Sequence, residues 1–212
     1  MKSMTQVFGA FGLAIGMAAT AQAAPITGGT TEVTITIAST LSALGASLSP
    51  IGTATLSSGA NPVVTFPITG GSTSLTGDLI EHNGSGLRIT GTNPTTTVDT
   101  QNYLVDTINE LVDADVSING ASQGTIGLFT LGSSGLSNVP LTLTSSAVTA
   151  LNTAFGLSGM DALTTSTPIG TLTSSPTVGS VAVAAPEPAT ITVLGVGLVA
   201  LAAVRRRTRA AR

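Results

Sequence analysis

Apolar and polar residues alternate along much of the chain, which is the pattern of a half-buried β-strand. In the segment TEVTITI, for example, Val33, Ile35 and Ile37 fall on one face. The same criterion predicts strands at residues 63–68, 75–80, 87–90, 97–105, 111–118, 125–131 and 141–144. Turn-forming pairs such as Asn83-Gly84 and Asn119-Gly120 separate these segments. Short strands at this spacing predict an all-β fold, an antiparallel sandwich or a barrel-like domain.

One segment follows a helical period instead. In LTSSAVTALNTAFG the apolar residues recur at i, i+3 and i+7 from Val148. Ser145 or Ser146 can cap the start, and Gly156 can end the last turn. We therefore expect one short amphipathic helix packed on the sheet.

A partial repeat marks the two ends of the expected domain. SPIGTATLSS, from Ser49, returns as TPIGTLTSSP, from Thr167. We expect two similar strands here, positioned to pair and close the domain. Residues 168–185 then become rich in Ser, Thr, Pro and Val, a composition typical of a linker. The β-rich domain is accordingly expected to span residues 24–167.

Composition narrows the kind of core that this domain can have. The chain is 42% hydrophobic but has no Trp, one Tyr and no Cys. The core must therefore consist mainly of Val, Ile, Leu and Ala, which favours a sheet. The absence of cysteine excludes thiolate catalysis and cysteine-ligated metals.

Charge is distributed unevenly along the chain. Residues 24–185 contain nine acids and one base, Arg88, which gives a net charge near −8. The acids are Glu32, Asp78, Glu81, Asp99, Asp106, Glu110, Asp113, Asp115 and Asp161. A body of this charge without a basic stripe repels phosphate backbones, so we expect no nucleic-acid partner.

The first 23 residues have the three parts of a secretory signal peptide. Lys2 gives a positive start, residues 7–19 are apolar, and small residues stand at positions 21 and 23. We expect signal peptidase to cut between Ala23 and Ala24, so that the body leaves the cytoplasm.

The other end of the chain combines a Pro-Glu-Pro tripeptide, an apolar run and a basic cluster. The run, residues 189–204, has sixteen residues without a charge. As a helix it would be about 24 Å long, against a hydrocarbon core of about 30 Å. The arginines at 205–207 can snorkel and should stay cytoplasmic. We expect a weak or transient transmembrane helix with the body outside.

These C-terminal features resemble the PEP-CTERM sorting signal, which exported proteins of some Gram-negative bacteria carry together with a signal peptide. The resemblance covers residues 186–212. It implies recognition by a membrane-embedded exosortase, cleavage near the tripeptide, and release or attachment at the cell surface. It also implies an association with exopolysaccharide and biofilm. The residues expected to direct processing and sorting are Ala21, Ala23, Ala24, Pro186, Glu187, Pro188, Arg205, Arg206 and Arg207.

Two motifs carry candidate chemistry. Residues 120–124 match G-x-S-x-G around Ser122, but the esterase elbow needs a helix after the serine. The strand-like TIGLFTL follows here, so we expect a hairpin turn.

Asp106, Glu110, Asp113 and Asp115 are candidate calcium ligands. Since the last two alternate with apolar residues, we expect them on the solvated face of a strand.

His82 is the single histidine, so a two-histidine metal site cannot form. We expect it at the surface beside the Asn83-Gly84 turn. Residues 76–120 resemble the HtaA-type haem-binding domain of bacterial surface proteins. Only His82 matches a position that this family uses at its haem. The iron-ligating tyrosine of the family lies earlier in the domain, whereas this chain has no Tyr before Tyr103.

The sequence thus predicts a non-enzymatic exported protein without a cofactor. It is expected to pass through the inner membrane to the envelope or the outside of the cell. There its acidic, Thr-rich surface contacts polysaccharide or carries O-linked glycans. Two alternatives remain: a surface domain that binds haem or another small ligand, and an esterase that uses Ser122.

Overall fold

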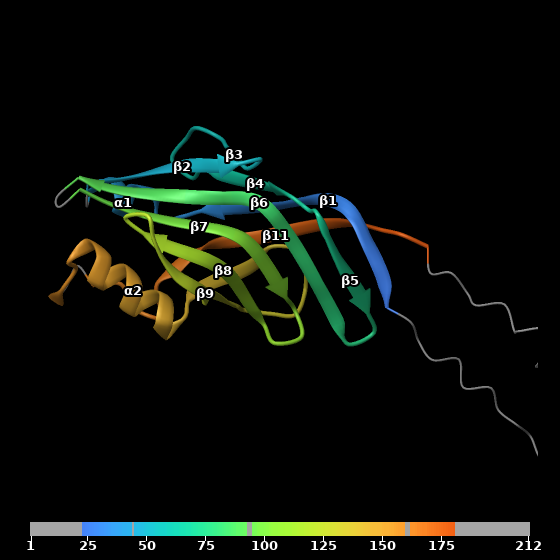
Figure 1. The fold of residues 1–212 in the computed structure, drawn as a ribbon. Coiled ribbons are helices and arrows are strands. Elements are labelled where there is room, and N and C mark those ends of the chain that lie inside the picture. Colours follow the sequence, from blue (N-terminus) through green and yellow to red (C-terminus); the bar gives the residue numbers. More distant parts are fainter. Residues whose placement is uncertain (1–22, 44, 93–94, 160–161, 181–212) are drawn as a thin grey trace, which may run out of the picture. The chain divides into compact units, whose positions relative to one another are not determined.

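The computed structural model describes residues 23–43, 45–92, 95–159 and 162–180. In this part the chain is mostly antiparallel sheet with two short helices (Figure 1). The strands are β1 (Ala24–Ile35), β2 (Ala46–Gly52), β3 (Thr55–Leu56), β4 (Val63–Pro67), β5 (Gly70–Ser74), β6 (Gly77–Thr92), β7 (Thr95–Asp106), β8 (Leu111–Ile118), β9 (Ala121–Leu131), β10 (Val139–Leu143) and β11 (Pro168–Val178). The helices are α1 (Ala38–Ala43) and α2 (Ser145–Phe155). The expected all-β class is confirmed, and α1 is an element that the pattern did not predict.

The sheet closes on itself. Neighbouring strands follow the order β11-β10-β9-β8-β7-β6-β5-β1, and β1 pairs again with β11 from Ile26–Val178 to Ile35–Gly170. β5 is short and pairs with only part of β1 and part of β6. Beyond the end of β5, β1 pairs with β4 and β6 pairs with β2. Closure of this kind leaves few free strand edges and encloses an interior.

Strand β11 corrects the expected domain boundary. Residues 168–178 were predicted to belong to a linker, but they pair with β1 on one side and β10 on the other. From Gly170 the stretch alternates between inward and outward residues, with Gly170, Leu172 and Ser174 buried. Its Ser- and Thr-rich composition therefore comes from a strand with a polar outer face. The domain continues to Val178.

The partial repeat also has a different outcome from the one expected. Both copies lie in strands, Pro50 in β2 and Pro168 in β11. However, β2 pairs with β6, whereas β11 pairs with β1 and β10. The expected pairing of the two copies is wrong, and β1 closes the sheet instead.

The expected turn at Asn83-Gly84 is a bulge inside one long strand. β6 runs through both residues, and its register with β7 shifts between His82 and Gly86. At the shift, Gly84 of β6 and Asn102 of β7 have positive φ angles of 75° and 54°. Asn and Gly tolerate this left-handed conformation, so they accommodate the bulge without ending the strand.

Helix α2 spans the predicted segment, with one difference at its start. The N-cap is Thr144, whose side chain accepts a hydrogen bond from the Ala147 amide, rather than Ser145 or Ser146. Gly156 ends the helix in the left-handed conformation, as predicted. The apolar side of the helix packs on the core, and α1 lies at the same end of the sheet (Figure 1).

The interior is aliphatic, as the composition predicted. Val64, Ile80, Ala114 and Val139 are each at most 1% exposed. Within the described residues, no helix is both long and apolar enough to cross a membrane. The expected spanning run at 189–204 and residues 1–22 of the expected signal peptide lie outside the described part of the chain.

We predict that Gly170→Ala destabilises the domain by about 1–3 kcal/mol, because a Cβ there overlaps the carbonyl oxygen of Thr34 in β1. Ser175→Ala, at an exposed position of the same strand, serves as the control and should be neutral. Urea denaturation measures the unfolding midpoint of both variants and of the wild type. A linker would tolerate either substitution, so an unchanged midpoint for Gly170→Ala would contradict the pairing of β11 with β1.

Candidate functional site

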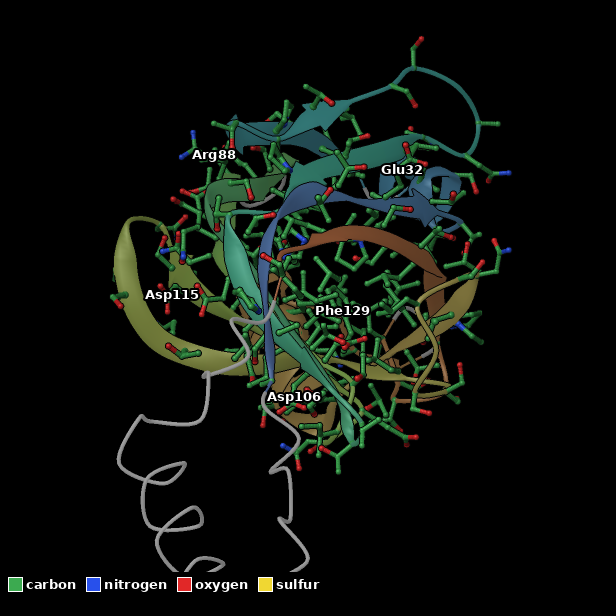
Figure 2. The ribbon with its side chains drawn as sticks, turned by 90° about the vertical axis from the view of Figure 1, so that its right-hand side faces the viewer. Glu32, Arg88, Asp106, Asp115 and Phe129 are labelled. Carbon is green, nitrogen blue, oxygen red and sulfur yellow. The ribbon has the colours of Figure 1, made fainter. Side chains whose placement is uncertain are left out.

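The interior of the sheet contains an apolar cavity of about 320 Å³. It lies at the helical end, where side chains from α1, α2 and the surrounding strands meet, among them Leu41, Ala150, Leu151 and Phe129. Figure 2 shows Phe129 inside the ring of strands, while Arg88 and Asp115 project outward. Among the residues that the structure describes, no charged side chain contributes to the wall of this cavity.

Two of the described side chains in the cavity wall are polar, and both come from β7. The Thr100 hydroxyl donates to the carbonyl oxygen of Leu87 at 3.0 Å, since a carbonyl can only accept. The Tyr103 hydroxyl therefore donates to the Thr100 oxygen, at 2.5 Å. Burial raises the pKa of Tyr103 to about 12, while the bond to Thr100 acts in the opposite direction. The phenol thus stays neutral, and both hydroxyl protons are already used within the protein.

His82 lies in the core, which corrects the expectation of a surface residue. It is 1% exposed and packs edge-on against Phe66, with ring centroids 6.1 Å apart. Its Nδ1 is 3.3 Å from the carbonyl oxygen of Tyr103, so Nδ1 carries the proton and donates it. The other nitrogen, Nε2, is then an acceptor.

A chain of hydroxyls completes the surroundings of His82. Thr31 of β1 donates to His82 Nε2 at 2.7 Å, and Ser174 of β11 donates to the Thr31 oxygen, also at 2.7 Å. Thr31 and Ser174 are themselves buried, at 2% and 7% exposure. Each of these three side chains has a partner, and the network joins the closing strands β1 and β11 to β6 and β7.

The G-x-S-x-G motif lies in the hairpin between β8 and β9, as expected, with no helix after it. Asn119 and Gly120 form the turn with φ angles of 52° and 80°. The Ser122 hydroxyl accepts from the Gly124 amide at 3.2 Å, on an exposed part of β9. Since both nitrogens of His82 are bonded in the core, Ser122 and His82 do not form a nucleophile–base pair.

The four candidate calcium ligands have separate local roles. Asp106 accepts from the backbone amides of Ile108 and Asn109 and so shapes the β7–β8 turn. Asp115 accepts from Asn102 and Thr125, and these bonds lower its pKa. Partial burial and the charge of Asp106 raise the pKa of Asp113.

Glu110 occupies the same turn as Asp106, with φ of 53°. Across the described part of the chain, no three acidic or histidine side chains converge in a way that could hold a metal ion.

The outer surface carries one ion pair that involves the only Lys or Arg among the described residues. Arg88 of β6 binds Asp99 of β7 through two contacts, at 2.6 and 2.7 Å. These hydrogen bonds raise the pKa of Arg88 and lower that of Asp99. The single cation of the body is thus neutralised, and the surface around it stays acidic.

Residues 184–207 match the PEP-CTERM protein-sorting motif. The match confirms the resemblance seen in the sequence, although it begins two residues earlier than expected and ends at Arg207. A protein with this motif is exported and is a target of exosortase. The matched residues lie outside the described part of the structure. No match was found among curated proteins.

Two solved structures resemble the fold. The C-terminal domain of HtaA from Corynebacterium glutamicum aligns with a TM-score of 0.52 and 15% identity, covering 74% of this chain and 99% of that domain. The haem-binding protein HtaB from the same organism aligns with a TM-score of 0.45 and 13% identity, covering 76% and 100%. At this identity, the likeness to the HtaA domain shows a shared fold and nothing about a ligand.

Among the described residues, the side chains that could ligate a haem iron do not fit haem. A haem iron needs an axial His, Cys, Met or Tyr ligand. The nitrogens of His82 are bonded to Tyr103 and Thr31, and Tyr103 is a neutral phenol whose proton is held by Thr100. The part of the cavity wall that the structure describes also offers no charged side chain to meet the haem carboxylates.

Sequence reasoning missed the buried network because Thr and Ser are usually exposed. A signal was nevertheless present. Thr31 is in phase with the apolar positions Val33 and Ile35, and Ser174 with Leu172. A polar residue on the apolar face of a strand indicates a buried partner.

We predict that the domain loses stability as the pH falls from 6.5 toward 4. Burial lowers the pKa of His82 to about 4, against an opposing effect of its bond to Tyr103, so the unfolded chain binds the proton first. The expected loss from this group between pH 7 and pH 5 is about 2 kcal/mol.

The control for this prediction is His82→Gln, which can accept from Thr31 but does not titrate. Unfolding free energies of both proteins are measured by urea denaturation at pH 7 and pH 5. The difference in unfolding free energy between the wild type and His82→Gln should fall by about 2 kcal/mol from pH 7 to pH 5. A constant difference would show that His82 is not held neutral in the folded state.

Proposed function

We propose that this chain is a non-enzymatic exported protein whose acidic β-domain is delivered by its C-terminal signal to the cell envelope or the extracellular matrix. The match of residues 184–207 to the PEP-CTERM motif is the observation that carries the proposal. Signal peptidase acts at one end and exosortase at the other. The apolar run at 189–204 is then a temporary membrane anchor, held by the arginines at 205–207.

The limits of the domain support processing at both ends. β1 begins at Ala24, which pairs with Thr73, so a cut after Ala23 leaves the strand complete. β11 ends at Val178. Seven residues, 179–185, then precede the Pro-Glu-Pro tripeptide. A cut at or near the tripeptide therefore removes no part of the closed sheet.

The surface supports a matrix role by its chemistry. It is acidic, and its one base is paired with Asp99. In the described residues the aromatic rings are buried or half-buried, so contact with polysaccharide would use hydroxyl and carboxylate hydrogen bonds. Asn102, Asp115 and Thr125 already form such a polar row across β7, β8 and β9. Association with exopolysaccharide and biofilm, and O-linked glycans on the threonines, belong to this proposal.

The two alternatives have less support. Haem binding lacks an available iron ligand among His82 and Tyr103. For ester hydrolysis, the single histidine of the chain is bonded in the core and is not paired with Ser122. Binding of a different small ligand is supported by the cavity.

We predict that replacing Pro186, Glu187 and Pro188 together by alanine blocks removal of the tail. The protein should then stay in the membrane fraction, since the apolar run at 189–204 is still attached. A peptide tag placed after Arg212 and followed by immunoblotting of cell fractions reports both cleavage and location.

The matched control replaces Val181 and Val183 by alanine, two positions before the matched segment. This variant should be processed and exported like the wild type. Equal size and equal location of the triple variant and the wild type would refute the sorting role of the tripeptide.

A further inference from the structure

We propose that the cavity beneath α2 binds an uncharged single-chain amphiphile: an aliphatic chain of roughly eight to ten carbons that ends in a hydrogen-bond donor such as a hydroxyl. The inference is independent of the sorting proposal, because it rests on the interior of the domain and not on its tail. Its basis is the size of the cavity, the absence of charge among the described side chains of its wall and the state of the hydroxyls of Thr100 and Tyr103.

Size sets the first limit on the ligand. A cavity of about 320 Å³ falls at the lower end of the range for small-molecule sites. Since a water-sized group occupies about 30 Å³, the space holds roughly ten non-hydrogen atoms. A single medium-length chain fits this volume, whereas a macrocycle of several fused rings does not.

The wall sets the second limit. The described side chains of this wall are aliphatic or aromatic, apart from Thr100 and Tyr103. A charged head group placed here would lose its hydration without gaining a partner of opposite charge. Water is also held poorly in an apolar cavity, so a ligand has little ordered water to displace. Both effects favour an uncharged aliphatic molecule.

The two hydroxyls set the third limit, which concerns the polar end of the ligand. The Thr100 proton is donated to Leu87, and the Tyr103 proton is donated to Thr100. Only oxygen lone pairs remain unused in this pair, so it can accept a hydrogen bond but cannot give one. An alcohol can donate to it, whereas a carboxylate or a ketone offers only acceptors.

The test uses calorimetric titration of the exported protein, purified without detergent, at pH 7.5. The probes are 1-octanol, octanoate and 2-octanone. We expect one saturable site for 1-octanol, with octanoate at least about tenfold weaker because its charge is buried. Affinity should rise about fourfold per methylene from 1-butanol to 1-octanol. No saturable binding of 1-octanol, or tighter binding of octanoate, would overturn the proposal.

Two variants of α2 locate the site. Ala150→Phe fills the cavity and should weaken 1-octanol binding at least about tenfold. Thr153→Phe places the same side chain on the exposed face of the same helix and should bind like the wild type. Equal affinity of the two variants would overturn the assignment of the cavity.

A third variant tests the hydrogen bond without changing the volume of the cavity. Thr100→Val removes the acceptor of the Tyr103 proton, which becomes free for a ligand. The wild type should prefer 1-octanol to 2-octanone by about threefold to tenfold, and Thr100→Val should reverse this order. The unfolding midpoint of Thr100→Val shows whether this variant retains the fold. If Thr100→Val is folded and keeps the wild-type preference, the proposed polar contact is wrong.

Discussion

The pairing of β1 with β11 is the constraint on which the rest of the structure depends. It joins strands from the two ends of the domain and turns an open sheet into a closed one. The same register places Thr31 opposite Ser174, where their hydroxyls meet inside the ring and continue to His82 and the backbone of β7. A buried network of this kind is favourable only when every member has a partner. Closure supplies those partners, and the network in turn opposes any shift in strand register.

Closure also explains the contrast between the two surfaces of the sheet. Each strand sends alternate side chains inward, and the composition offers mainly Val, Ile, Leu and Ala for those positions. Such small side chains fill the wall of a ring but leave space at its helical end, where α1 and α2 cover the cavity. The outward positions carry most of the acids, many threonines and the paired Arg88. An apolar interior and an anionic exterior therefore follow from the same alternation.

Much of this architecture could be predicted from local pattern. The bounds of β8 match the prediction residue by residue, and α2 lies on the predicted segment. β11 could not be recognised in this way, because its Ser- and Thr-rich sequence has the composition of a linker. Only its pairing with β1 in the folded chain identifies it as a strand. The burial of His82 also depends on Thr31, which is 51 positions away in the chain. The cavity has no sequence signature, since it arises from many side chains that fail to meet. By contrast, the sorting signal was readable because its three parts follow one another directly in the chain.

The central claim is that a complete closed domain is released from the segments that carry it out of the cell. Processing after Ala23 and near Pro186 would leave every strand from β1 to β11 intact. Intact-mass spectrometry of the exported protein tests this claim most directly. The account predicts a chain that begins at Ala24 and ends between Val178 and Pro188, with any glycans as added mass. A mature chain that retains Arg212, or one that ends before Val178, would contradict it.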